Sequence, residues 1–381
     1  MQLIFGATWD IISIIFFVLL IIFLPIVMRI RIFSSLQKTL LEMEKMVKNS
    51  KDLIIKLSKE NGGKKAAMKQ VDEFLDFFII PPTDLDPNGI VQKFNQILEL
   101  SESRFKKMVE TIAPKANREI KANIIMTLKV AIGLNSIYKM IRHNFELAKK
   151  TGNLQILLAL QMNIPLIMRI FKAQYKGAEA FSNGLPVGDG AGPLTIAMLL
   201  KKEDKIESID EMIYAIRKDE NRKIIILRPE GPGAKLGKVA KAANTLIDKF
   251  NIKKIIMVDA AVKMEGEETG KVAEGVGVVI GGTGVEKWFI EDKILRGNIE
   301  IDSIVIKMSQ EEAITQMDKK ILEGCKIALE RIKASIEWTE KGNNILIVGV
   351  GNSCGIPNIV EDPSKIKLKK EDGKDGDPKR P

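Results

Sequence analysis

The residues best suited to chemistry lie within residues 224–238, IIILRPEGPGAKLGK, where a glycine-rich turn follows an apolar run and precedes a helical pattern. Glycine lets the backbone approach an anion closely, and the first amides of a helix attract negative charge. The spacing matches neither GxGxxG nor a P-loop, because Val239 stands where a P-loop has Ser or Thr. A plain tight turn is therefore the alternative to an anion site. The predicted anion contacts are Arg228, Gly231, Gly233, Lys235, Gly237 and Lys238.

Three further loops carry polar side chains after apolar runs. Asp259 ends the next apolar run, at the position from which dinucleotide-binding folds hold a ribose hydroxyl. Thr283 lies in VIGGTGVEKW, and Asn352 and Ser353 lie in VGVGNSCGIPN. Because loops after parallel strands gather at one edge of a sheet, we expect these residues to line one crevice with the glycine turn. The predicted occupant is a phosphorylated small molecule such as a nucleotide, and Asp189 in NGLPVGDGAGP would close the crevice.

An acidic, glycine-broken segment follows Asp259. Its carboxylates at Glu265, Glu267 and Glu268 are oxygen ligands of the kind that Mg²⁺ prefers, and a metal between them and a nucleotide phosphate is the prediction. The spacing matches no defined metal motif, so a solvated acidic loop is the alternative.

Several catalytic classes are disfavoured by residue counts. One histidine, His143, and two cysteines, Cys325 and Cys354, nearly exclude a zinc site and a disulfide framework. Cys354 and Ser353 have no histidine base in their own part of the chain, which argues against a thiol nucleophile or a hydrolase triad.

The elements that would position these residues change character along the chain. After about residue 218, continuous apolar runs at 223–227, 254–258, 304–307 and 344–350 alternate with helical patterns at 236–250 and 311–339. Such runs predict strands covered on both faces. We expect a parallel-sheet, Rossmann-like α/β domain over residues 219–360.

Helical periodicity dominates the chain before that domain. It covers residues 64–80, 90–111, 116–150, 154–175 and 193–200, which predicts a helical domain over residues 64–218. Residues 361–381 hold thirteen charged side chains and are expected to form a disordered tail.

Residues 11–28 are apolar and uncharged, and at 1.5 Å per residue they span about 27 Å, close to the hydrocarbon thickness of a bilayer. Residues 1–31 therefore predict a transmembrane anchor, against the alternatives of a cleaved signal peptide and a buried helix. Arg29, Arg31 and Lys38 follow the run and no cation precedes it, so we expect the N-terminus outside and the bulk in the cytoplasm. Residues 154–171 are also apolar, but Arg169 and several amides favour a bundle helix.

Charge is distributed unevenly. Residues 29–70 carry eleven basic and four acidic side chains, and residues 101–176 carry fourteen and four. The first block lies where an anionic leaflet would attract it. The second could lie on the same leaflet or bind nucleic acid, and the low aromatic content makes nucleic acid the weaker prediction.

Residues 32–63 contain a short heptad pattern, with apolar residues at alternating spacings of four and three from Leu36 to Leu57. The pattern predicts either a coiled coil joining copies of the chain into a homo-oligomer or an amphipathic helix packed on the same chain.

Taken together, the N-terminal span and the motifs PVGDGAGP, RPEGPGAKLGK, VDAAVKMEGEETG, AEGVGVVIGGTGVEK and VGVGNSCGIPN resemble an uncharacterised archaeal family of membrane-anchored proteins with a domain of unknown function. The resemblance implies an archaeal membrane protein, and it implies no activity or site residue.

The function predicted first is a membrane-anchored cytoplasmic protein whose α/β domain binds a phosphorylated ligand. The alternatives are a membrane scaffold that oligomerises and recruits partners, which predicts a filled crevice, and a membrane-associated nucleic-acid binder. Whether the chain is an enzyme stays open at this level.

Overall fold

The computed structural model describes residues 2–64, 66–82, 89–219, 221–282 and 284–370, and in the first helix it describes side chains for Ser13 and from Phe16 onward. The backbone forms two compact units. One contains Met1–Asn49 and Gly133–Phe171, and the other contains Ser50–Ile132 and Lys172–Pro381. Three long helices contribute residues to both units, and each unit is described by itself.

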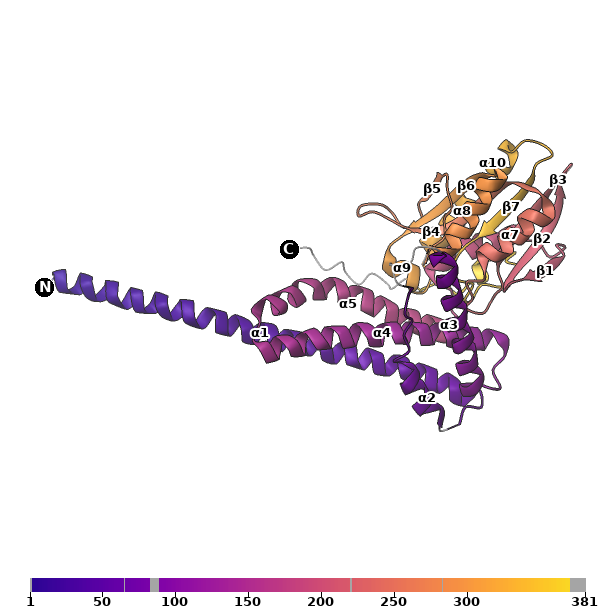
Figure 1. The fold of residues 1–381 in the computed structure, drawn as a ribbon. Helices are drawn as coiled ribbons and strands as arrows, with labels where there is room; N and C mark the ends of the chain where they lie inside the picture. Colours follow the sequence, from indigo (N-terminus) through magenta and orange to yellow (C-terminus); the bar gives the residue numbers. More distant parts are fainter. Residues whose placement is uncertain (1, 65, 83–88, 220, 283, 371–381) are drawn as a thin grey trace. The chain divides into compact units, whose positions relative to one another are not determined.

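The first unit is a helical bundle made from the N-terminal part of α1 (Gln2–Glu60), the end of α4 (Arg118–Thr151) and the beginning of α5 (Leu154–Ser182) (Figure 1). Leu36, Leu40 and Met43 of the heptad pattern are buried in this single chain. Of the two interpretations of that pattern, packing on the same chain is the one observed. These three apolar residues of the heptad pattern are buried without a second copy of the chain.

The apolar run predicted as a span lies on α1, which continues through Pro25 without a break. The large apolar side chains from Phe16 to Ile30 are 43–64% exposed, whereas Ile32 is 4% exposed. Three helices among the described residues are long and apolar enough to cross a membrane, within 16–60, 118–151 and 154–182.

The helical part of the second unit packs around one apolar core. Here α2 (Ala66–Phe74) and α3 (Ile90–Ile112) lie against the end of α1 and the start of α4. Ile54, Ile112 and Leu128 are fully buried in this core. The predicted helices at 64–80 and 90–111 are thus present, the first ending at Phe74 rather than residue 80.

A seven-stranded sheet forms the rest of the second unit. Its strands are β1 (Ile206–Ile209), β2 (Met212–Asp219), β3 (Arg222–Pro229), β4 (Ile252–Val262), β5 (Val272–Gly275), β6 (Glu300–Met308) and β7 (Asn344–Gly349). The order is β1-β2-β3-β7-β4-β6-β5. The four central strands β3, β7, β4 and β6 are parallel, and β1, β2 and β5 are antiparallel to their neighbours. The sheet is therefore mixed: the predicted parallel pairing is found for the four central strands, and not for β1, β2 and β5.

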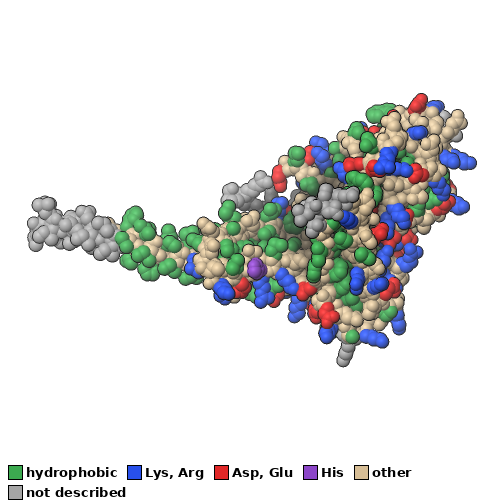
Figure 2. Space-filling model, viewed as in Figure 1, with side chains coloured by type: hydrophobic (Ala, Val, Ile, Leu, Met, Phe, Trp, Pro, Cys, Tyr) green, Lys and Arg blue, Asp and Glu red, His purple; other side chains and the backbone are tan. Residues whose placement is uncertain are grey.

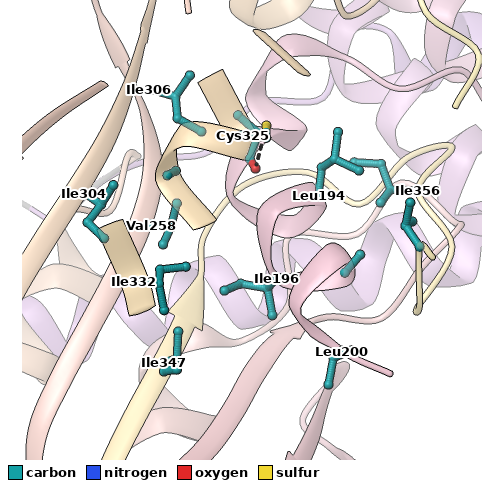
Figure 3. Packing of buried hydrophobic residues seen from close by; sticks show 14 of the residues in the cluster. Leu194, Ile196, Leu200, Val258, Ile304, Ile306, Cys325, Ile332, Ile347 and Ile356 are labelled. Atoms are coloured by element: carbon teal, nitrogen blue, oxygen red, sulfur yellow. Dashed lines mark hydrogen bonds between the residues drawn. The ribbon is translucent and has the colours of Figure 1, made fainter. Parts of the chain in front are cut away.

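Helices cover both faces of the sheet, as the continuous apolar runs predict. One face packs against α6 (Ala191–Leu199) and α10 (Lys319–Trp338), and Figure 3 shows its core. The short helix α9 (Gln310–Ile314) adds the partly buried Ala313 to that core. The other face packs against α7 (Val239–Phe250) and α8 (Val285–Gly297). Alternation along β3 sends Ile226 to the first core and Ile225 and Leu227 to the second.

Two features of the structure extend past the predicted domain boundaries. The α/β part of the second unit includes α6, β1 and β2, so it begins well before residue 218. The helix α6 belongs to it because almost all of its residues are buried in the core on one face of the sheet. The tail expected to be disordered from residue 361 is packed as far as residue 370. It forms a short 3₁₀ turn, η2 (Pro363–Lys365), and Ile366 is 8% exposed because its side chain joins the core under α6. Residues 371–381 lie outside the described residues.

Candidate functional site

The predicted anion corner lies between the end of β3 and the start of α7. Its backbone amides already donate to side chains of the same chain. The Gly231 amide donates to Asn358 Oδ1 at 2.8 Å, and the Ala234 amide donates to Asn123 Oδ1 at 2.8 Å. These amides therefore satisfy two amide side chains rather than an external phosphate.

Gly233 permits a close approach, but the approaching group is the protein itself. A Cβ at this position would lie 3.1 Å from Glu119 Cα and 3.3 Å from Ala122 Cβ, both in the first turns of α4. At Gly231 a Cβ would collide with the carbonyl oxygen of Ile356. The glycines thus allow the corner to be covered by α4 and by the loop after β7.

Arg228, at the end of β3, is 0% exposed. Its guanidinium donates to the carbonyl oxygens of Pro229 at 3.0 Å and Pro357 at 2.6 Å, with longer bonds of 3.3 Å to those of Ile356 and Asn358. Burial lowers the pKa of Arg228 to about 9. The arginine predicted to hold an anion therefore holds the loop after β7 against β3.

Ser353 connects the same two loops from the other side. Its hydroxyl lies 2.7 Å from the Gly233 carbonyl oxygen and 2.8 Å from that of Glu230, and its amide donates to the Lys235 carbonyl at 2.9 Å. The side chain is fully buried. Ser353 thus lies beside the glycine corner, and its hydroxyl joins the two loops rather than facing a crevice.

The N-terminus of α7 also has an internal anion. The Ala240 amide donates to Glu286 Oε2 at 2.5 Å, at the place where a bound phosphate would benefit from the helix dipole. Burial raises the pKa of Glu286. The two predicted lysines have acidic partners, since Lys235 pairs with Glu230, and Lys238 Nζ lies 3.5 Å from Glu99 Oε1. Gly237, the sixth predicted contact, has a positive φ of 70° and lies against Met212.

A pair of carboxylates, Asp259 and Asp189, is the second feature near the carboxyl ends of the central strands. Asp259 of β4 is 6% exposed and accepts the Ala260 amide at 2.7 Å and the Gly281 amide. Burial, and then the charge of Asp189, raise the pKa of Asp259 well above its ordinary value. Burial also raises the pKa of Asp189, which accepts the Asn352 amide at 2.9 Å. The pair can hold a proton, and Asp189 lies near enough to Asp259 for their charges to interact.

The predicted magnesium ligands do not converge. Glu267 pairs with Lys307, which is the main cause of its lowered pKa, and it accepts the Met264 amide at 2.9 Å. Glu265 and Glu268 are exposed. Among the described residues, no three His, Cys, Asp or Glu side chains form a group that could hold a metal ion. The solvated acidic loop is the interpretation that fits, and Thr283 lies outside the described residues.

The thiols are poor nucleophiles in this structure. Cys325 and Cys354 are both fully buried, and burial raises the pKa of each to about 12. His143 is exposed on α4. Neither thiol is therefore accessible to a substrate in this structure.

The loops lie where the sequence predicts them, but the side chains that accept their backbone amides were not predicted. Asn123, Asn358 and Glu286 carry no local signal for their roles, because each contacts the corner from 46 or more residues away in the chain. The corner therefore combines the predicted residues in one place and uses their donors internally.

Two family models cover most of the chain. A model described as "Protein of unknown function (DUF1512) N-terminal domain" matches residues 10–184, and one described as "Domain of unknown function (DUF1512) C-terminal" matches residues 187–357. The chain belongs to the DUF1512 family. The break between the two models, at residues 184–187, falls shortly before α6 and the strands of the sheet in this DUF1512 protein. The glycine corner and the carboxylate pair lie mainly within the C-terminal match.

No curated protein matches the DUF1512 protein. Among solved structures, a crystal structure of a proteasome-assembly chaperone homologue from Mycobacterium tuberculosis matches at 13% identity. The match covers 41% of this chain and 83% of that chain with a TM-score of 0.27. A likeness at that level says nothing about the activity of the DUF1512 protein.

Proposed function

We propose that this DUF1512 protein is a membrane-anchored scaffold. In this proposal one N-terminal span holds the chain on the bilayer with its N-terminus outside, and the cytoplasmic α/β unit is a folded platform for protein partners. The observation that carries the proposal is α1, one helix that passes directly from an exposed apolar segment to side chains buried in the bundle.

The exposed segment of α1 supports the anchor. Figure 2 shows hydrophobic side chains gathered on this part of the helix. Burying one large apolar side chain stabilises a protein by about 1.5–3 kcal/mol, so a run exposed from Phe16 to Ile30 would be costly in water and is favourable in lipid. Arg29 and Arg31, directly after the run, support a cytoplasmic location for the remainder.

The filled glycine corner favours the scaffold over the phosphate-binding alternative. Its amides, guanidinium and serine hydroxyl bond to the same chain, as described above, so an anion would have to displace existing partners. The cations of residues 101–176 are less available to nucleic acid than their number implies, because several of them pair with acidic side chains. These pairs are Lys106–Glu211, Lys121–Glu110, Lys129–Glu102 and Arg118–Glu230.

Alkaline extraction of membranes from cells that express the full chain tests the anchor. The protein should stay in the membrane pellet, and Leu20→Arg should release a large fraction, because a charge near the centre of a span costs about 2.5–3.5 kcal/mol. Leu41→Arg is the matched control, since Leu41 is 59% exposed and lies outside the run. Release of the unmodified protein, or equal release of both variants, would contradict the anchor.

Ligand binding tests the second half of the proposal. Nucleotides with Mg²⁺ should leave the thermal unfolding temperature of the purified protein unchanged, whereas protein partners recovered after crosslinking in cells should persist in Lys235→Ala. A nucleotide-dependent rise in unfolding temperature that disappears in both Gly233→Val and Lys235→Ala would restore the phosphate-binding hypothesis.

A further inference from the structure

We propose that the turn between α4 and α5 is a second membrane contact, which touches the headgroup layer of the bilayer that α1 spans. This inference rests on the proposed anchor. It concerns only the first unit, to which the span, the end of α4 and the start of α5 all belong.

Contacts within the bundle establish the level of this turn along α1. The rings of Phe33 and Phe145 meet edge to face, with centroids 5.4 Å apart. Four residues before Phe33, Arg29 lies beside Gly152, where a Cβ would be 3.3 Å from Arg29 Nη2. Because α4 runs antiparallel to α1, residues later in α4 lie closer to the span. The turn at residues 151–153 is therefore level with Arg29, the first cation after the apolar run.

That level corresponds to lipid headgroups if α1 spans the bilayer. The apolar run ends at Met28, so the hydrocarbon core ends there as well. Headgroup regions add about 5–7 Å on each side of the core. Leu154 begins α5 directly after the turn, and one helical turn further on, Leu158 lies about 6 Å farther along the axis. The turn and the first residues of α5 thus fall within the headgroup layer.

The side chains at the turn match this environment. Lys149 and Lys150 occupy the last turn of α4 and are exposed. Leu147, Leu154 and Leu158 are 37–40% exposed on the same end of the helical hairpin. Basic residues attract an anionic leaflet, and leucines beside them can enter the boundary between headgroups and acyl chains. The contact would hold the bundle upright against the membrane at two points rather than one.

Quenching of a fluorophore by nitroxide-labelled lipids tests the contact in the full chain. A single introduced cysteine can be labelled selectively, because both native cysteines are fully buried. The labelled variants are Leu154→Cys at the turn, Phe23→Cys in the span and Leu41→Cys as an exposed control about 18 Å beyond Arg29. The vesicles are phosphatidylcholine with and without phosphatidylglycerol. They carry a headgroup nitroxide for Leu154→Cys and Leu41→Cys, and an acyl-chain nitroxide for Phe23→Cys, because Phe23 lies inside the hydrocarbon core of the proposed span.

We expect quenching at Leu154→Cys to be several times that at Leu41→Cys, and to increase with phosphatidylglycerol. Strong quenching at Phe23→Cys with Leu154→Cys no more quenched than Leu41→Cys would overturn the second contact and leave the anchor intact. An unquenched Phe23→Cys would overturn the anchor and the second contact together. In the charge-reversed background Lys149→Glu with Lys150→Glu, the dependence on phosphatidylglycerol at Leu154→Cys should disappear, and its persistence would contradict the role of the lysines.

Discussion

Replacing Arg228 with methionine separates a structural role at the glycine corner from a ligand-binding role. Methionine keeps the apolar length of the side chain and removes every donor. The Pro357 and Pro229 carbonyls, now bonded at 2.6 and 3.0 Å, would lose a charged donor, and two more carbonyls would lose weaker bonds. Because the side chain is fully buried, water cannot readily replace those bonds.

The size of the effect follows from these contacts. Hydrogen bonds to a charged group contribute about 1.5–3 kcal/mol each, so the two short bonds and two long ones amount to roughly 6 kcal/mol. Burial of the charge opposes them, as the lowered pKa of Arg228 shows, and methionine removes that cost. We expect a net loss of about 3 kcal/mol, which lowers the unfolding temperature of a unit of nearly 300 residues by about 5 °C.

Thermal unfolding in detergent, followed by tryptophan fluorescence, measures this loss. Arg331→Met is the matched control, since Arg331 is a half-exposed arginine paired with Glu274 at 3.2 Å. The control should change the free energy of unfolding by less than about 0.5 kcal/mol. If Arg228→Met were as stable as Arg331→Met, the corner would not depend on this guanidinium, and a ligand-binding role would regain support.

Three further changes probe other parts of the second unit. Burial and the neighbouring Asp189 raise the pKa of Asp259, so ionisation of this carboxyl destabilises the fold as pH rises above 3.8. Asp259→Asn should therefore be more stable than the unmodified protein at neutral pH. In urea unfolding, its stability should also depend less on pH. An unchanged profile would show that Asp259 ionises freely. Asp204→Asn should do the opposite, because a hydrogen bond from Arg217 lowers the pKa of Asp204 and stabilises the fold until pH falls through that lowered value. Leu128→Ala empties a fully buried position of the helical core and should cost about 2–5 kcal/mol in the same assay, where a loss below about 1 kcal/mol would contradict the packing.

The central strands were predictable because their signal is local. The runs at 223–227, 254–258 and 304–307 fall within β3, β4 and β6, and the run at 344–350 covers β7 and one residue beyond it. Residues on both faces of these strands are buried. The edge strands carry weaker signals. In β2, burial does not alternate, since four buried residues precede partly exposed ones. The strand β5 has four residues and ends in the exposed Glu274 and Gly275. Their strand structure depends on pairing with β3 and β6, which no local pattern encodes.

The helix α8 was missed for a related reason. It begins after Gly284, whose positive φ of 78° reverses the chain, and only Val285 and Ile290 of its residues are buried. With so few buried positions, it has a weak apolar periodicity. The glycine-rich approach therefore looked like a loop alone.

The apolar run of α1, the four central strands and the positions of the glycine-rich loops were predictable from the residues alone, because each depends on neighbours in the chain. Tertiary structure decided how those loops are used. Asn123, Asn358 and Glu286 come from distant elements to accept the amides of the corner, and Arg228 turns to backbone carbonyls after β7. A glycine turn exposes the same donors whether an anion or the protein satisfies them. The folded chain supplies acceptors at fixed positions, and this decides between the two.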